Sequence, residues 1–326
     1  MLASVRRHFF VLALAACSAL SAHASEWPAK PINFVVPWPA GGASDVAARV
    51  IAPLLAEDLK QPVIVLNKAG ATGNLGAEFV LQTPPDGYNL FLGSGSHLIN
   101  SSLSEYNQQP LRYNIVKDFD FATVVTDLRM VMVVNPAVKA NTLQELVTLA
   151  KANPGKLTFS SSGNGSTQHL SGELFLRAAG VDMLHVPYKG IAPSVNDLIG
   201  GVVDMSIESL ASVLPHIKAG KLRAIAVMSG EPIPALPDVP LARSVYPQLV
   251  VSGPQYIGVP KGTPPAVLHR LNAAFGKVLQ DPRVRAHLDG LGVAVLYASP
   301  DESARMIRAE REKWARVIKD ANIKTN

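Results

Sequence analysis

Three glycine- and serine-rich segments carry the residue types best suited to hold an anion. They lie at 37–45, 93–97 and 160–168, and each follows an apolar run and precedes a helical pattern. N–H groups at a helix N-terminus are unpaired and partly positive, and glycine lets the backbone approach a ligand closely. Ordinary turns use the same residues, so composition alone leaves a binding role and a turn role open.

These segments lack the patterns of nucleotide-binding loops. None contains G-x-G-x-x-G or the lysine of a P-loop. The side chains nearby that could become cations are His97, in the second segment, and His169, just after the third. We therefore expect an anion to be held mainly by N–H and hydroxyl groups.

Serine and histidine in these segments also raise the question of hydrolysis. The candidate nucleophiles and bases are Ser94, Ser96, Ser161, Ser162, Ser166, His97, His169 and His185. The sequence has no G-x-S-x-G elbow to expose a nucleophilic serine. It also has no H-E-x-x-H and no His/carboxylate cluster at metal-ligand spacing. Neither a catalytic residue nor a metal site is predicted.

Two residues of the first segment each have two interpretations. Asp45 is placed to complement the dipole at the start of a helix, or to meet a cationic part of a ligand. Trp38, between two prolines, is either a core residue or the wall of a pocket.

The elements that must position these segments alternate between strand and helix patterns. In the first third of the chain, strands are expected at 32–37, 63–66 and 88–92, and helices at 44–59 and 75–82. This order predicts an α/β domain with parallel strands. Pro53 should kink or split the first helix.

The middle of the chain repeats the alternation after a long apolar run at 121–134. Thr142 opens a capping box for a helix to about Ala152. Further strands are expected at 157–161, 185–188, 203–207 and 224–227, with a short helix at 193–199. A second domain of the same kind is therefore predicted.

The last third returns to the first domain. An extended run at 250–259 precedes a helix that begins near Pro264, and a second capping box at Ser299 opens the final helix. If both helices cover the first domain, the chain crosses between two lobes twice, near 125–131 and near 249–255. A double crossing is a natural hinge.

The first 24 residues resemble an export signal. Arg6 and Arg7 precede an apolar stretch, and Ala22 and Ala24 fit a small-x-small cleavage site. A competing interpretation is a lipobox ending at Cys17, the only cysteine of the chain. Cleavage after Ala24 would leave a chain without cysteine, which must rely on its core rather than on disulfides.

Bulk composition narrows the class of protein. The chain has 326 residues, of which 48% are apolar and 17% charged, with a formal net charge of +5. Its charges are scattered, and no basic run indicates nucleic-acid binding. The mild positive surplus weakly favours anionic solutes.

Several stretches together resemble one family, the substrate-binding proteins of tripartite tricarboxylate transporters, or Bug receptors. The matching stretches are 27–32, 35–45, 48–49, 61–76, 85–90, 145–170, 185–190, 197–205, 217–227 and 236–240. They cover nearly the whole chain after the signal. The resemblance implies a two-lobed periplasmic binding protein (type II-like), each lobe an α/β sandwich, joined by two crossing strands.

The resemblance also implies a division of the chain and a role. Residues 25–127 plus 251–326 would form domain 1, and 128–250 domain 2, with 1–24 the signal peptide. The protein would be a periplasmic receptor, not an enzyme, and would need no cofactor. As a monomer it would deliver a small organic acid to the membrane components of the transporter. The loops at 37–42 and 161–169 would grip the ligand carboxylate through backbone N–H groups and bridging waters.

The expected ligand-binding residues follow from these segments and from the family. The main ones are Gly41, Gly42, Ser161, Ser162, Gly163, Ser166, Thr167 and His169. The others are Trp38, Ala40, Asp45, Thr72, Gly93, Ser94, Ser96, Tyr188 and Glu208.

The sequence departs from the family pattern in places that bear on the ligand. Trp38 stands where Phe is more usual, and Glu208 where the family more often has Asp. If Glu208 lines the cleft, it would repel a second carboxylate and favour an aromatic acid or a ligand with an amine. Dicarboxylates, tricarboxylates, aromatic acids, amino acids and nicotinate-like acids all remain open.

Two other functions compete with transport. In the first alternative the same receptor feeds a sensor kinase, which a kinase gene next to its own would reveal. An exported serine hydrolase is the second alternative, which a covalent serine probe would label.

Overall fold

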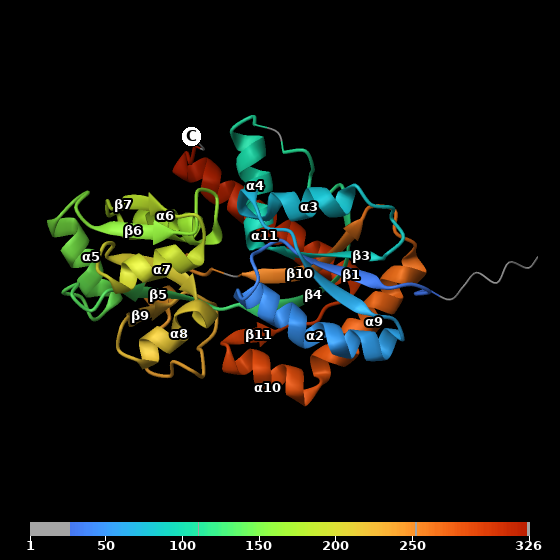
Figure 1. The fold of residues 1–326 in the computed structure, drawn as a ribbon. Helices are drawn as coiled ribbons and strands as arrows, with labels where there is room; N and C mark the ends of the chain where they lie inside the picture. Colours follow the sequence, from blue (N-terminus) through green and yellow to red (C-terminus); the bar gives the residue numbers. More distant parts are fainter. Residues whose placement is uncertain (1–26, 110, 252, 325–326) are drawn as a thin grey trace, which may run out of the picture.

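The computed structural model describes residues 27–109, 111–251 and 253–324 of the chain. They form two lobes, each a mixed β-sheet with helices on both faces (Figure 1). This is the α/β class and the two-lobed architecture predicted from the sequence. The proposed signal peptide and Cys17 lie outside the described residues.

The first sheet has six strands and takes its residues from both ends of the chain. In spatial order its strands are β11 (Val293–Val295), β4 (Phe119–Leu128), β10 (Pro254–Pro260), β3 (Asn89–Ser94), β1 (Ile32–Val36) and β2 (Val63–Asn67). β1 pairs in parallel with β2 and β3, and β10 is antiparallel to both neighbours. The carboxyl ends of β1 and β3 therefore lie at the same edge.

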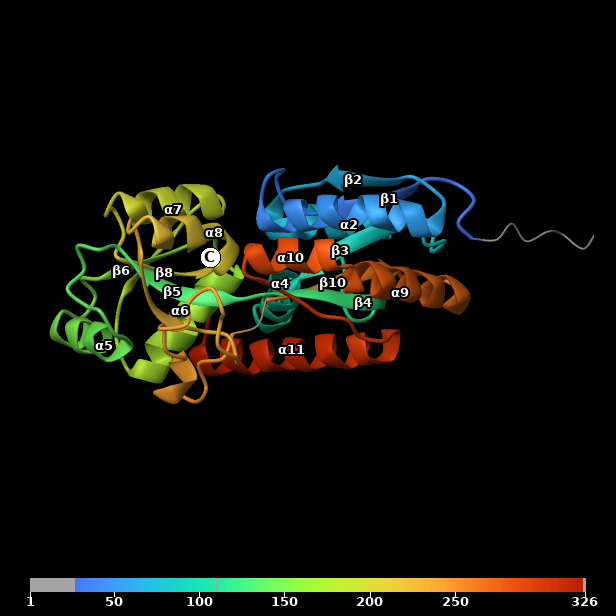
Figure 2. The same ribbon diagram turned by 90° about the horizontal axis from the view of Figure 1, so that it is seen from below.

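Helices cover both faces of this sheet (Figure 2). One face packs against α2 (Ala43–Leu59), α9 (Pro265–Gln280) and α10 (Pro282–Gly290). The other packs against α3 (Asn74–Leu81), α4 (Gly95–Tyr106) and α11 (Pro300–Ala321). β1 is buried on both faces, and apart from the half-buried Asn33 all its residues are apolar, because neither side of the strand meets water.

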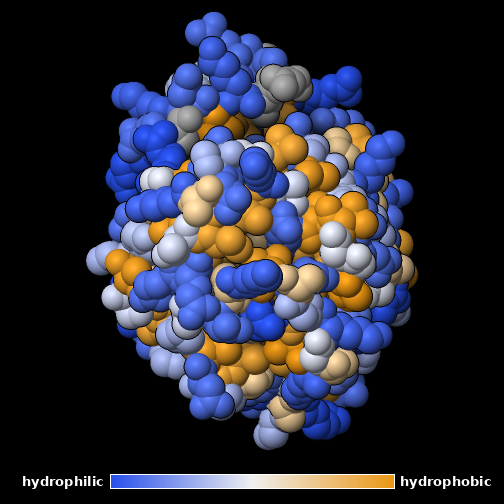
Figure 3. Space-filling model, turned by 90° about the vertical axis from the view of Figure 1, so that its left-hand side faces the viewer, coloured by the Kyte–Doolittle hydropathy of each residue, from blue (hydrophilic) through white to orange (hydrophobic). Residues whose placement is uncertain are grey.

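The second sheet has five strands from the middle of the chain. In spatial order they are β7 (Leu184–Pro187), β6 (Thr158–Ser161), β8 (Met205–Ser209), β5 (Met130–Val134) and β9 (Arg223–Val227). One face packs against α5 (Leu143–Ala152) and α6 (Thr167–Ala179), the other against α7 (Ile191–Ile199) and α8 (Leu210–Lys218). Figure 3 views the free end of this lobe, where apolar and hydrophilic residues are interleaved.

The two crossings between the lobes lie side by side. β4 ends at Leu128 and β5 begins at Met130, so the long apolar run is divided at Arg129. The Leu128 N–H donates to the Gly253 carbonyl at 2.9 Å, and the Gly253 N–H donates to an Asp127 carboxylate oxygen at 2.6 Å. A Cβ on Gly253 would lie 2.9 Å from the Leu128 carbonyl oxygen, so only glycine allows this close approach.

The final helix also joins the lobes. Its first half packs on the first sheet through Ile307. Its second half places Trp314 and Ile318, both fully buried, in the second lobe's apolar cluster with Leu170 and Phe175 of α6. The expectation that the last helix covers only the first domain is therefore incomplete.

Pro53 does not split its helix. α2 runs without a break through Pro53, whose side chain is exposed. Ile51 and Leu55, on either side, are buried against the sheet. This packing offsets the hydrogen bond that proline cannot donate. Within the described ranges, no helix is both long and apolar enough to span a membrane.

Candidate functional site

The first turns of α2, α4 and α6 meet at the boundary between the lobes. Gln255 of β10 lies opposite Ser94, the residue before α4, and its side-chain amide donates to Ser44 Oγ of α2 at 2.6 Å. The hydroxyls of Ser96 and Thr167, in the first turns of α4 and α6, are 3.2 Å apart. Helix N-termini from both lobes therefore face one region.

Asp45 holds the loop between β1 and α2. Its carboxylate accepts hydrogen bonds from the Gly41 N–H, Arg49 Nε and Asn67 Nδ2 at 2.8–2.9 Å. Burial alone would raise the pKa of Asp45, but these hydrogen bonds outweigh it and hold the pKa below its ordinary value. Asn67 also donates to the Trp38 carbonyl. The acid fixes the loop from within.

The two glycines of this loop differ in role. Gly41 has a φ of +85°, which glycine adopts without strain, and its N–H is already donated to Asp45. The Gly41 N–H is therefore used within the loop itself, and its role in ligand binding stays a prediction. The N–H groups of Gly42, Ala43 and Ser44 donate to no acceptor among the described residues. With Ala40, both glycines are exposed.

At the second helix, Ser94 caps α4 together with His97. The Ser94 N–H donates to His97 Nδ1 at 3.0 Å, which leaves the imidazole proton on Nε2. Nε2 lies against Gly73 and has no hydrogen-bond partner in the described ranges. Burial lowers the pKa of His97 to about 4, despite contacts with the Gly73 and Ser94 backbone that favour the charged form. This histidine is neutral at physiological pH.

Three more residues predicted to bind the ligand lie in this part of the first lobe. The Trp38 ring, half-buried, lies 5.9 Å from the His97 ring, so Trp38 forms a wall between the first loop and α4. Thr72 adopts a left-handed conformation, φ +54°, just before Gly73. Gly93 is buried against the Tyr256 ring, which a Cβ would meet at 2.1 Å. Packing against Tyr256 accounts for a glycine at this position, and its role as a ligand residue stays a prediction.

In the second lobe, side chains of α6 fold back onto the loop before it. Ser166 Oγ accepts the His169 N–H, and the Gly165 N–H donates to His169 Nδ1. Ser162 Oγ donates to Gln168 Oε1 at 3.0 Å. Gly163 needs its φ of +129°, which other residues rarely adopt. The loop is therefore held in shape before any ligand binds.

Two stacked histidines lie beneath this loop. The rings of His169 and His185 are 4.1 Å apart and nearly parallel. Burial lowers the pKa of His169 to about 3, helped by His185, and that of His185 to about 4. Both rings stay neutral at physiological pH, so none of the three histidines near the helix termini supplies a fixed positive charge.

One serine and one histidine do meet in the geometry that hydrolysis would need. Ser161 Oγ lies 2.7 Å from His185 Nε2, and it also bonds to the Gly163 backbone. No described carboxylate hydrogen-bonds to the other ring nitrogen to orient it, unlike a catalytic triad. Among the described residues there is also no group of His, Cys, Asp and Glu that could hold a metal ion.

Tyr188 and Glu208 are both engaged within the second lobe. The Tyr188 hydroxyl donates to Asp197 at 2.6 Å, and burial followed by this carboxylate raises the pKa of Tyr188 to about 12. Glu208 is fully buried on β8 rather than on a cleft surface. Its predicted repulsion of a second ligand carboxylate therefore does not act through direct contact.

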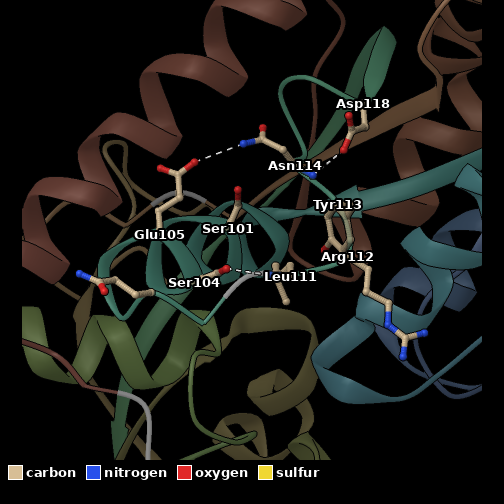
Figure 4. Close-up of a pocket in the computed structure, with 9 residues that line it drawn as sticks. Ser101, Ser104, Glu105, Leu111, Arg112, Tyr113, Asn114 and Asp118 are labelled. Atoms are coloured by element: carbon tan, nitrogen blue, oxygen red, sulfur yellow. Dashed lines mark hydrogen bonds between the residues drawn. The ribbon is translucent and has the colours of Figure 1, made fainter.

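A separate pocket opens at the other end of α4 (Figure 4). Its volume is about 440 Å³, and its lining includes Glu105, Asp118 and Tyr113. The C-terminal end of a helix is partly negative, and two carboxylates add to this. Arg112 points away from the other labelled side chains and is largely exposed. The pocket disfavours an anion, which the helix N-termini favour.

Three residues of the site escaped the sequence reasoning. Through their side-chain amides, Asn67 and Gln168 bind the two loops, and Gln255 binds the first turn of α2. Gln255 gives the clearest signal, because it is a polar side chain within an apolar strand and is fully buried.

Comparisons with known proteins agree with this arrangement. A family model described as tripartite tricarboxylate transporter family receptor matches residues 47–323. Protein BugT of Bordetella pertussis is 38% identical over 302 residues, which is 92% of each chain.

Two solved structures are similar over most of the chain. R. palustris Rpa4515 with adipate has a TM-score of 0.84 and 31% identity, covering 92% of this chain and 99% of the other. MatC from Rhodopseudomonas palustris with bound malate has a TM-score of 0.80 and 30% identity, covering 90% and 100%. The resemblance predicted from the sequence motifs is confirmed: the chain belongs to the tripartite tricarboxylate transporter receptor family, a family of solute-binding proteins and not of enzymes.

Proposed function

We propose that this protein captures a small carboxylate anion between its lobes and delivers it to the membrane components of a tripartite carrier. The observation that carries the proposal is the meeting of three helix N-termini, two from the first lobe and one from the second. The unpaired N–H groups of Gly42, Ala43 and Ser44 lie at one of them. Such groups stabilise an anion without a charged side chain. The adipate and malate bound to two relatives are of the same chemical class.

Closure of the lobes would complete the site. We assign residues 25–127 and 251–326 to domain 1 and residues 128–250 to domain 2, with the hinge at the paired Leu128 and Gly253. A ligand that contacts both loops binds the closed form better and shifts the population toward it. The hydrogen bond between Ser96 and Thr167 is one interaction that forms across this boundary.

The place of action follows from the family and from the first residues of the chain. Relatives in this family are periplasmic binding proteins, and residues 1–24 have the charge and apolar pattern of an export signal. We infer that this protein is exported to the periplasm, with cleavage after Ala24 favoured over lipid attachment at Cys17.

A thermal-shift screen of the ligand-stripped protein would test the proposal. The panel contains adipate, malate, citrate, benzoate and nicotinate, with neutral sugars and amines as controls. A ligand at about 100 times its Kd adds about 2.7 kcal/mol of stability. A rise in Tm with one class of acid supports the proposal. Stabilisation by sugars or amines alone, or by no compound at all, would contradict it.

A further inference from the structure

Glu208 is a buried carboxyl group without a cationic partner. It is fully buried, and no described lysine or arginine forms an ion pair with it. Burial raises the pKa of Glu208 to about 7, although hydrogen bonds from Gln168, Ser206 and Ser194 favour the ionised form. A carboxyl group in this state changes its charge near neutral pH.

Glu208 is connected to the ligand loop by one side chain. Gln168 Nε2 donates to Glu208 Oε2 at 3.2 Å, and Gln168 Oε1 accepts from Ser162 Oγ at 3.0 Å. Glu208 and Gln168 are buried, while Ser162 is half-buried on the loop between β6 and α6. We call these three residues the relay.

The charge of Glu208 sets the direction of the whole relay. An ionised carboxylate only accepts, so Gln168 must turn its NH₂ group inward and its oxygen toward Ser162. Ser162 then gives its only proton to Gln168 and presents lone pairs to the loop surface. When Glu208 is protonated, it can donate to the Gln168 oxygen, and the amide turns over. Its NH₂ group then donates to Ser162, whose proton is free to point outward.

We propose that the relay couples the binding of a carboxylate anion at the loop of residues 161–166 to the protonation of Glu208, an inference that rests on the proposed function. In the protonated state Ser162 is a donor to the anion, and the buried negative charge is gone. In the ionised state Ser162 offers only lone pairs, which repel a carboxylate. The relay is therefore a positioning device behind the site.

Apart from the relay, no described titratable group forms a hydrogen bond or ion pair with Glu208. Besides Gln168, Glu208 contacts Ser194 of α7, Ser206 and Ser209 of its own strand, and Val131, its partner on β5. The other titratable residues on the elements packed around β8 are His169, Glu173, Arg177, Asp197, His216 and Lys218. None of them forms a hydrogen bond or ion pair with Glu208 in the described structure.

The relay predicts that affinity for the carboxylate falls as pH rises. Small carboxylic acids are already ionised above about pH 6, since their pKa values resemble those of Asp and Glu. A bound anion raises the pKa of Glu208 above its ligand-free value of about 7. Affinity is then highest below that pH and falls as pH rises through it, by at most about tenfold per pH unit. Binding near pH 7 takes up a fraction of a proton.

Calorimetric titration with adipate tests the coupling. Affinity is measured at about pH 6 and about pH 8.5, and proton uptake is measured near pH 7 in two buffers of different ionisation enthalpy. We expect the wild-type affinity to fall about tenfold over this range, with measurable proton uptake. If another acid of the screen binds and adipate does not, that acid replaces it.

Three variants separate the relay from other causes. Glu208→Gln keeps the shape and is always neutral, so we expect wild-type low-pH affinity at both pH values and no proton uptake. Ser162→Ala should bind more weakly at low pH and depend less on pH. Glu173→Gln, which removes a half-buried carboxyl group on α6 outside the relay, should keep the wild-type dependence.

A wild-type affinity that is equal at both pH values would overturn the relay but leave the proposed function standing. The same holds if Glu208→Gln keeps the full wild-type pH dependence. If no acid of the screen binds at either pH, the proposed function fails, and the relay fails with it.

Discussion

At the scale of single residues, the first loop is shaped by Asp45, whose carboxylate is engaged by hydrogen bonds from neighbouring residues. Asp45 occupies the Gly41 N–H and ties the loop to Arg49 and Asn67. The rigid residues around Trp38 and the bonds of Asp45 both keep the exposed glycines of this loop in one ordered conformation. A loop that is already ordered loses less conformational entropy when an anion binds.

Gly42 is the residue whose replacement should affect binding most selectively. Its φ is −76°, and a Cβ would meet only the Pro39 carbonyl oxygen, at 3.6 Å, so other residues fit. Gly42→Asp places a negative charge at the helix N-terminus and should weaken carboxylate binding by about 100-fold or more, in line with an unfavourable charge in a desolvated site. Circular dichroism and Tm should stay near wild type.

The matched control is Gly42→Asn, which has nearly the same shape and no charge. It should retain measurable binding of the same acid by calorimetry. If both variants lose binding affinity equally, the cause is steric and not the added charge. If Gly42→Asp binds with unchanged affinity, Gly42 is not part of the site.

Glu208 gives a prediction for stability that needs no ligand. Its folded-state pKa of about 7 lies above the ordinary value of 4.5, so the folded protein is favoured below pH 4.5 and loses this advantage as pH rises through about 7. Glu208→Gln should therefore raise the free energy of unfolding above pH 7, relative to its effect near pH 5, by up to about 3 kcal/mol. Urea unfolding at both pH values measures this difference, and an equal effect at both would contradict the assignment.

At the scale of elements, capping residues and apolar periodicity predicted much of the fold. The side chain of Thr142 accepts from the Glu145 N–H at the start of α5, and Ser299 forms the predicted capping box of α11. A helix is expected after residues 93–97, but the sequence analysis gives no bounds for α4, because its third helical residue is a histidine that fills the capping box in place of Glu or Gln. The start of α10 is marked in the sequence by Asp281 followed by Pro282, an N-cap and a first-turn proline, although this helix is not among those expected above.

The candidate site was predictable only in part, for a physical reason. Glycine and serine at strand ends marked the loops at 37–45 and 161–169 in sequence. The burial of Glu208 on β8 and its bond from Gln168 on α6 depend on packing between elements far apart in the chain. A local pattern carries no information about such contacts.

The crossing strands yield a prediction about the hinge. Gly253→Ala should force the strands apart, because the new Cβ would lie 2.9 Å from the Leu128 carbonyl oxygen. We expect a loss of about 1–3 kcal/mol in stability, as for other overpacked sites. The control Gly230→Ala meets only Val250, at 3.7 Å, and should change stability by less than about 0.5 kcal/mol. Equal Tm values for both variants would contradict the close crossing.

At the scale of the whole molecule, the lobes share a core as well as two strands. Trp314 and Ile318 of α11 lie in the same apolar cluster as Phe175 of α6. Opening of the lobes must therefore keep this contact or slide along it. The final helix limits the range of motion on one side of the hinge.

Two isoleucines of α11 test this shared core. Ile318→Ala should cost about 2–5 kcal/mol and increase hydrogen exchange in β5 and β8 of the second lobe. Ile307→Ala, on the same helix but in the first lobe's cluster, should increase exchange in the first lobe only. If Ile318→Ala leaves exchange in the second sheet unchanged, the two lobes do not share a core.

The most direct test of the account is a titration of backbone amide signals by nuclear magnetic resonance. A carboxylic acid that raises Tm is added to the deuterated, isotope-labelled mature protein. We predict that the amide signals of Gly42 and Ala43 in the first lobe, and of Gly163 and Ser166 in the second, shift together with one Kd. Shifts confined to one lobe, or to the pocket lined by Glu105 and Asp118, would contradict it.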